Sequence, residues 1–123
     1  MVTSATLLDF GPQGVLAANI DNTSTITVTC TNLTGYNIGL DKGLNGGSVT
    51  TRQMKSAGPA LINYSLFRDA ARLLNWGQTI GTDTVLSAGI GVAQPFTVFG
   101  RIPPQASPIP ALYTDTITIT VTF

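Results

Sequence analysis

The side chains that most often carry out chemistry in proteins are scarce in this sequence. Its six acidic residues are all aspartate, and the chain contains neither histidine nor glutamate. Because Ser-His-Asp and Cys-His catalysis both need a histidine, neither arrangement can form. Two carboxylates about 5–10 Å apart would suit glycoside hydrolysis, and Asp9, Asp21 and Asp115 are the candidates for such a pair. Solvated turn residues are the favoured interpretation of all three, so no catalytic residue is expected.

The sequence also lacks the pattern of a metal, cofactor or phosphate site. The aspartates are spread along the chain without the spacing of a calcium loop, and Cys30 is the only cysteine. Cys30 lies in an alternating strand pattern and is expected to be a small buried residue. The run 41–47 is rich in glycine but lacks the Gly-Lys-Ser/Thr ending of a phosphate loop, which favours a hairpin loop. We therefore expect no metal and no cofactor.

Four aromatic residues are candidates for a sugar-stacking face: Trp76, Tyr36, Tyr64 and Tyr113. Aromatic side chains at alternating strand positions more often belong to the core. We favour the core interpretation and keep a carbohydrate-binding adhesin that uses Trp76 as an alternative.

The composition indicates one folded domain with few charges. The 123 residues suit a single domain spanning 1–123, since domains cluster around 100–150 residues. Hydrophobic residues make up 43% and charged residues 10%, the reverse of a disordered chain. The six Lys and Arg residues are scattered and the net charge is zero, whereas phosphate recognition needs clustered cations. We expect no nucleic-acid partner and no small-molecule substrate.

Strict alternation of apolar and polar residues marks the strands. Residues 25–31 and 116–123 alternate Ile, Val, Cys or Phe with Thr, which is typical of strands with one solvated face. Shorter strands are expected at 2–10, 36–40, 61–67 and 95–102, with weaker ones near 48–55 and 84–86. Only 65–76 has helical spacing, enough for one turn, with Asp69 and Arg72 as an i,i+3 pair. The pattern predicts an all-β sandwich or barrel.

The last predicted strand is the most regular one, yet no further strand follows it in the sequence. An immunoglobulin-like sandwich has about seven strands, and only about six are convincing here. An unpartnered last strand would leave Ile117, Ile119, Val121 and Phe123 beside an open groove, which a strand from another chain could fill. The alternative is a central last strand that its own chain pairs on both sides.

Several motifs, taken together and in order, resemble the spore coat protein U domain family over nearly the whole chain. These motifs are Leu8-Asp9-Phe10-Gly11, residues 26–30, residues 36–43, Arg52-Gln53-Met54-Lys55, residues 63–72, Trp76-Gly77, residues 98–103 and residues 113–121. The family includes subunits of archaic (Csu-type) chaperone-usher pili.

The resemblance implies an incomplete immunoglobulin-like β-sandwich whose seventh strand comes from a donor. A periplasmic chaperone would supply this strand first, and a neighbouring pilus subunit would replace it during assembly at an usher. The groove would be lined by Leu8, Phe10, Ile117, Ile119, Val121 and Phe123, and the carboxylate of Phe123 would anchor the chain to the chaperone. The protein would pass through the periplasm and end in a cell-surface pilus.

Two departures from the family pattern leave the place in the fibre open. Members usually carry a cysteine before the first strand, paired with the counterpart of Cys30, but residues 1–5 contain none. The donor extension of shaft subunits is also missing. A trimmed shaft pilin and the C-terminal anchoring domain of a two-domain tip adhesin both fit. A spore coat component and strand-swapped self-association are further alternatives.

Overall fold

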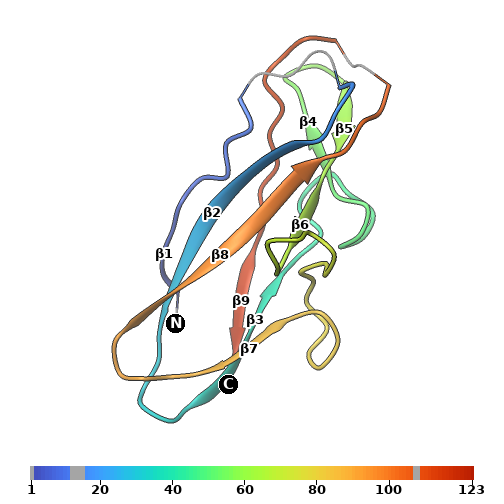
Figure 1. Cartoon of the computed structure of the whole chain (residues 1–123). Helices are drawn as coiled ribbons and strands as arrows, with labels where there is room; N and C mark the ends of the chain where they lie inside the picture. The colour runs from blue at the N-terminus through green and yellow to red at the C-terminus, as the bar shows by residue number, and fades with distance from the viewer. Residues whose placement is uncertain (1, 12–15, 107–108) are drawn as a thin grey trace.

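The computed structural model describes residues 2–11, 16–106 and 109–123, which form β-strands and no helix. It follows that none of the described residues belongs to a helix long and apolar enough to cross a membrane. The strands are β1 Val2–Ala5, β2 Ile20–Thr29, β3 Gly35–Leu40, β4 Gln53–Lys55, β5 Leu61–Asn63, β6 Ser65–Phe67, β7 Val85–Ala88, β8 Ala93–Ile102 and β9 Ile119–Thr122 (Figure 1).

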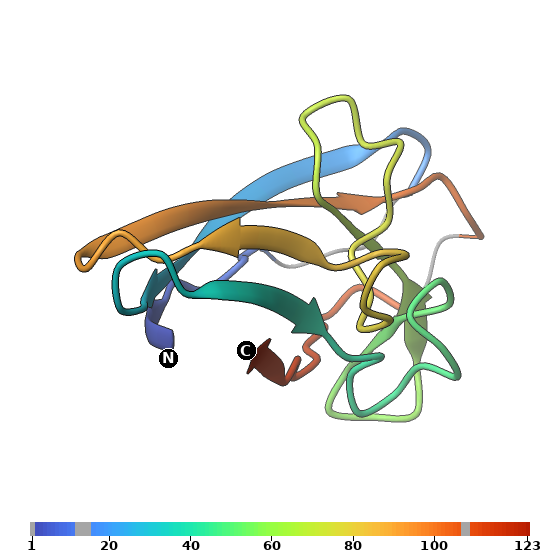
Figure 2. The same cartoon turned by 90° about the horizontal axis from the view of Figure 1, so that it is seen from below.

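The strands form two facing antiparallel layers. One sheet has the order β1-β2-β8-β6 and the other the order β7-β3-β9, while β4 and β5 form a small hairpin. Figure 2 shows β2 and β8 above β3 and β9. Strands that follow each other in the sequence, such as β2 and β3 or β8 and β9, lie in different sheets. The predicted all-β, immunoglobulin-like sandwich is confirmed.

The core lies between the layers, where the alternating residues of facing strands meet. Ile26 and Val28 of β2, Ile38 of β3, and Val98 and Ile102 of β8 are all at most 4% exposed. Burying one such side chain contributes about 1.5–3 kcal/mol to the free energy of folding. The alternating pattern therefore explains why the two sheets pack face to face. Cys30 is buried at the end of β2, as predicted.

The helical turn predicted within 65–76 is wrong. Strand β6 is followed by a tight reversal in which the Asp69 carboxylate accepts the N–H groups of Leu73 and Leu74. Arg72 adopts a left-handed backbone conformation, with a φ of +58°. Trp76 N–H then donates to the carbonyl of Leu66. Side-chain capping of these amides competes with helix formation, and a hairpin-like loop, 68–75, results.

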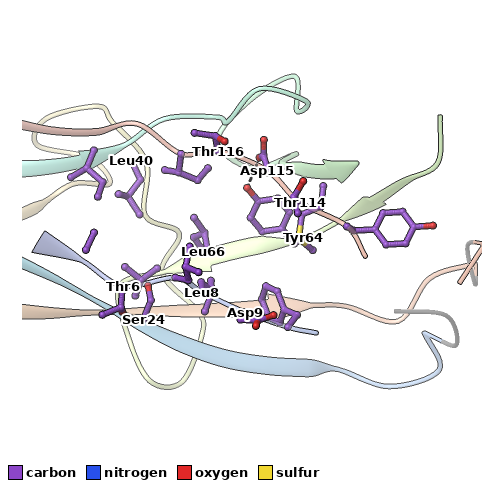
Figure 3. A pocket seen from close by; sticks show the side chains of 18 of the residues that line it. Thr6, Leu8, Asp9, Ser24, Leu40, Tyr64, Leu66, Thr114, Asp115 and Thr116 are labelled. Atoms are coloured by element: carbon purple, nitrogen blue, oxygen red, sulfur yellow. Dashed lines mark hydrogen bonds between the residues drawn. The ribbon is translucent and has the colours of Figure 1, made fainter. Parts of the chain in front are cut away.

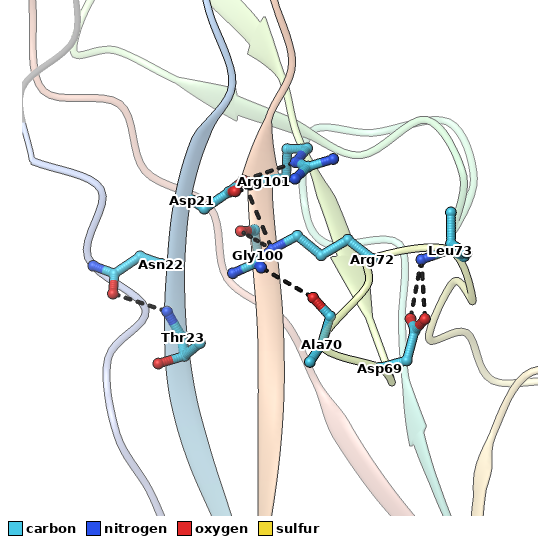
Figure 4. Close-up of polar contacts among 9 residues, drawn as sticks. All are labelled: Asp21, Asn22, Thr23, Asp69, Ala70, Arg72, Leu73, Gly100 and Arg101. Carbon is cyan, nitrogen blue, oxygen red and sulfur yellow. Dashed lines mark hydrogen bonds and ion pairs between the residues drawn. The ribbon is translucent and has the colours of Figure 1, made fainter.

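The side chain of Arg72 contacts the outer face of the β2–β8 sheet and does not form the predicted ion pair with Asp69. Its Nε donates to the carbonyl of Gly100 at 3.2 Å, and its guanidinium lies 5.6 Å from the ring centroid of Phe99. Its Nε also lies 3.7 Å from the carboxylate of Asp21, which Arg101 contacts as well (Figure 4). The hydrogen bond from Arg101 is the main reason that the pKa of Asp21 is lowered.

A buried arginine joins the ends of several strands. Arg52 is fully buried and donates to four backbone carbonyls, those of Asp41, Val49, Leu40 and Trp76, at 2.7–3.0 Å. Burial lowers the pKa of its guanidinium, but arginine stays charged in proteins. The charge is therefore stabilised by the dipoles of these four carbonyls.

Replacing this arginine should destabilise the fold strongly. We expect Arg52→Met to lower the free energy of unfolding by roughly 3 kcal/mol or more, because each buried carbonyl left without a donor costs about 1–3 kcal/mol. Arg68→Met is the control, since Arg68 Nε donates to the single carbonyl of Asn75, and roughly 1 kcal/mol is expected. Urea unfolding of the wild type and both variants measures the difference. Equal losses would contradict the role of Arg52.

Candidate strand-binding groove

Strand β9 has a neighbour on one side only within the described residues. It pairs antiparallel with β3, with Ile119 opposite Leu40. The N–H of Asp41 donates to the carbonyl of Thr118 at 3.2 Å, which continues the same register. Because hydrogen-bonded and non-hydrogen-bonded pairs alternate in an antiparallel ladder, the backbone groups of Ile117 and Ile119 point away from β3. They form an open sheet edge.

Strand β1 forms the corresponding edge of the other sheet. Ala5 lies opposite Ile26 of β2, and the N–H of Thr6 donates to the carbonyl of Thr25 at 3.0 Å. The same alternation points the backbone of Ala5 away from β2. Figure 2 shows β1 and β9 on the same side of the sandwich, so the two open edges border one region of the molecule.

A cavity of about 520 Å³ lies between these two edges. Residues 5–10 form one wall and residues 112–117 and Ile119 the other. Core side chains form its floor, among them Ile26, Leu40, Leu66 and Val98 (Figure 3). The volume is within the range of about 300–1,000 Å³ that binding pockets span. The interior of the sandwich is thus accessible from this side.

The structure brings four of the six predicted groove residues together. Leu8, Phe10, Ile117 and Ile119 line the cavity and pack, half-buried, against the core. Val121 also packs against the core but lies outside the lining. Phe123 lies outside it too, with 72% of its surface exposed.

The predicted strand 116–123 is shorter than expected, because β9 starts at Ile119. The predicted strand 2–10 likewise ends at Ala5 as a strand. Beyond it, Leu7 is 90% exposed whereas Leu8 and Phe10 turn toward the core. The side-chain amide of Asn22 donates to the carbonyl of Asp9, in place of a backbone ladder. Both walls of the groove therefore contain extended chain outside the regular strands.

Leu8 and Phe10 occupy a notch that a glycine leaves in β8. A Cβ atom at Gly100 would lie 2.5 Å from Cδ2 of Leu8 and 2.9 Å from Cζ of Phe10. Glycine at this position lets both side chains approach the strand backbone. The first wall of the groove is thereby held against the sheet by apolar packing.

Polar groups close one part of the groove. The hydroxyl of Tyr64 donates to Oδ2 of Asp115, and Oδ1 of Asp115 accepts the N–H of Leu44 at 2.9 Å and the amide of Asn45 at 3.2 Å. Burial and the bond to Asp115 raise the pKa of Tyr64 well above its ordinary value. Tyr64 therefore stays a neutral donor. Its contact with Asp115 has no signal in the sequence, where strand alternation predicts only that Tyr64 is buried.

The candidate catalytic and sugar-binding groups are held in hydrogen bonds and ion pairs or are buried in the core. Asp9 accepts the N–H of Gly11, and Asp21 is bound by two arginines on the opposite face from the groove. The four aromatic residues considered for sugar stacking, Trp76, Tyr36, Tyr64 and Tyr113, are at most 5% exposed and belong to the core. No group of three or more metal-ligating side chains occurs among the described residues. The arrangement suits binding of an extended chain.

Comparison with known proteins gives the same fold and a family. The Spore Coat Protein U domain matches residues 1–120. Protein U of Myxococcus xanthus is 32% identical over 117 residues, which are 90% of this chain and 65% of Protein U. The CsuC-CsuE chaperone-tip adhesion subunit pre-assembly complex, from archaic chaperone-usher Csu pili of Acinetobacter baumannii, contains a chain that superposes with a TM-score of 0.67. That match has 23% identity and covers 100% of this chain and 38% of the other. The chain spans only part of both proteins, and it belongs to the spore coat protein U domain family.

Proposed function

We propose that this chain is a single pilin-type domain, a structural subunit of a chaperone-usher fibre that assembles by accepting a β-strand from another chain. The observation that carries the proposal is the pair of open sheet edges, at β1 and β9, on either side of a cavity that reaches the core. An extended chain between them could pair with both edges while its alternate side chains enter the cavity.

The energetics favour a peptide strand as the occupant. Each large apolar side chain buried in the cavity would contribute about 1.5–3 kcal/mol, and an inserted backbone would satisfy the outward groups of Ala5, Ile117 and Ile119. An open strand edge is otherwise a site for uncontrolled association. A strand donor thus completes the core and removes the exposed edge.

The order of partners follows from the family. A periplasmic chaperone would fill the groove first, and the donor segment of a neighbouring subunit would replace it at the usher, on the way from the periplasm to a surface pilus. The complex from Acinetobacter baumannii joins a chaperone to a tip adhesion subunit. The exposed position of Phe123 leaves its carboxylate accessible to basic residues of a chaperone.

Two variants of this function differ in the place of the domain. A shaft subunit and the C-terminal anchoring domain of a tip adhesin are the two alternatives, and the groove serves both. A sugar-binding module has less support, because Trp76 and the three tyrosines are buried. A spore coat component would have the same groove but would lie on the spore instead of in a pilus.

The groove should accept a peptide with alternating apolar residues. We define the strand probe as a peptide of about nine residues in which isoleucine alternates with threonine, flanked by lysines for solubility. At a probe concentration of about 100 times Kd we expect the Tm to rise by roughly 10 °C. Differential scanning calorimetry measures the shift. A probe with proline at alternate positions is the control, because it lacks the N–H groups needed for pairing.

A charge on the inner face of β9 should abolish this effect. Ile119→Asp would place an unpaired carboxylate in an apolar cavity, and we expect no probe-induced rise in Tm. Thr120→Asp is the matched control, because Thr120 is exposed on the outer face of the same strand, and it should respond like the wild type. A wild-type chain indifferent to the probe, or an unimpaired Ile119→Asp, would refute the groove.

The location of the protein separates a pilus from a spore coat. Immunogold labelling of the producing cells should decorate thin fibres on the cell surface. Label confined to spores would favour the coat and overturn the pilus proposal, whatever the groove binds.

A further inference from the structure

The second wall of the groove is held in place by an aspartate on a neighbouring loop. Oδ1 of Asp41 accepts the N–H of Thr118 at 2.9 Å and the N–H of Gly43 at 2.9 Å. The N–H of Asp41 itself donates to the carbonyl of Thr118 at 3.2 Å. One residue therefore forms both hydrogen bonds that fix Thr118, the residue directly before β9.

The side chain of Asp41 substitutes for its own carbonyl. In a regular antiparallel pair, the N–H of Thr118 would donate to the backbone carbonyl of Asp41. That carbonyl instead accepts Nε of the buried Arg52 at 2.9 Å. The carboxylate oxygen takes over as acceptor, so the edge stays in register although the ladder proper stops at Ile119.

The residue held in this way lies between two lining residues of the groove. Ile117 and Ile119 flank Thr118, and both line the cavity. If the N–H of Thr118 lost its acceptor, the segment before β9 would be free to twist. The outward backbone groups of Ile117 would then lose their alignment with an incoming strand.

We propose that Asp41 is a positioning residue for strand capture, one that keeps the 115–118 segment extended and ready to pair. This inference rests on the proposed function of the groove. The acting group is the Oδ1 acceptor, which an asparagine also provides. Asp41 contacts the groove edge rather than the occupant, so its loss should weaken capture of a strand by any donor.

The test compares three variants in binding to the strand probe by isothermal titration calorimetry. Asp41→Ala removes the acceptor and should weaken probe affinity roughly 10-fold, as expected for the loss of one hydrogen bond that the bound state needs. Asp41→Asn retains the oxygen acceptor and should restore affinity to within about 3-fold of the wild type. This rescue is not expected if the charge of Asp41 is what matters.

A carboxylate far from the groove provides the matched control. Asp69 also accepts two backbone N–H groups, those of Leu73 and Leu74, but within loop 68–75. Asp69→Ala should lose comparable local hydrogen bonding, and it should leave probe affinity unchanged. Equal weakening by Asp69→Ala and Asp41→Ala would mean that stability alone governs binding, and it would overturn the inference.

Hydrogen exchange of the unmodified chain tests the same point without a variant. In the empty chain, the amide of Thr118 should be protected, whereas those of Ile117 and Ile119 should exchange rapidly and gain protection when the probe binds. An unprotected Thr118 amide, or wild-type affinity in Asp41→Ala, would refute the role of Asp41 and leave the groove intact. A wild-type chain that does not bind the probe would overturn both proposals.

Discussion

Backbone N–H and C=O groups need partners, and among the residues that the structure describes β9 has a neighbouring strand on one side only. The strand pairs with β3, while its other edge lies beside a cavity lined by Ile117, Ile119 and core residues. Strand β1 presents the facing edge from the second sheet. Buried backbone groups are nearly always paired in native structures. The two open edges are therefore the reason why we propose an added strand as the occupant of the groove.

A second theme is the use of side chains where the ladder is interrupted. Arg52 takes the carbonyls of Leu40 and Asp41, the Asp41 carboxylate takes the N–H of Thr118, and Asp115 takes the hydroxyl of Tyr64. Arg52 and Asp41 thus satisfy backbone groups, and Asp115 satisfies a side-chain hydroxyl. A chain with only 10% charged residues thus uses several of them at places where regular strand pairing stops.

The sequence predicts the sandwich well because the apolar residues of the alternating pattern are the ones that face the core in the structure. Ile26 and Val28, buried in β2, follow directly from the period-two pattern, and so do the half-buried Ile117 and Ile119. Contacts between residues distant in the chain, such as Arg72 with Asp21, have no local signature. The helical spacing of 65–76 misleads because capping by Asp69 and the left-handed Arg72 reverse the chain. Local pattern sets which face is apolar, whereas side-chain bonds decide where strands end.

The direction of β9 has a mechanical consequence. Strand β9 runs along the long dimension of the molecule (Figure 1), and hydrogen bonds in an antiparallel ladder lie perpendicular to the strands. A segment seated beside β9 and pulled from its end would load all of those bonds in shear at once, rather than peeling them open singly. A fibre built from such contacts would resist tension through all of these hydrogen bonds together. Its strength would depend on the number of residues paired along the groove.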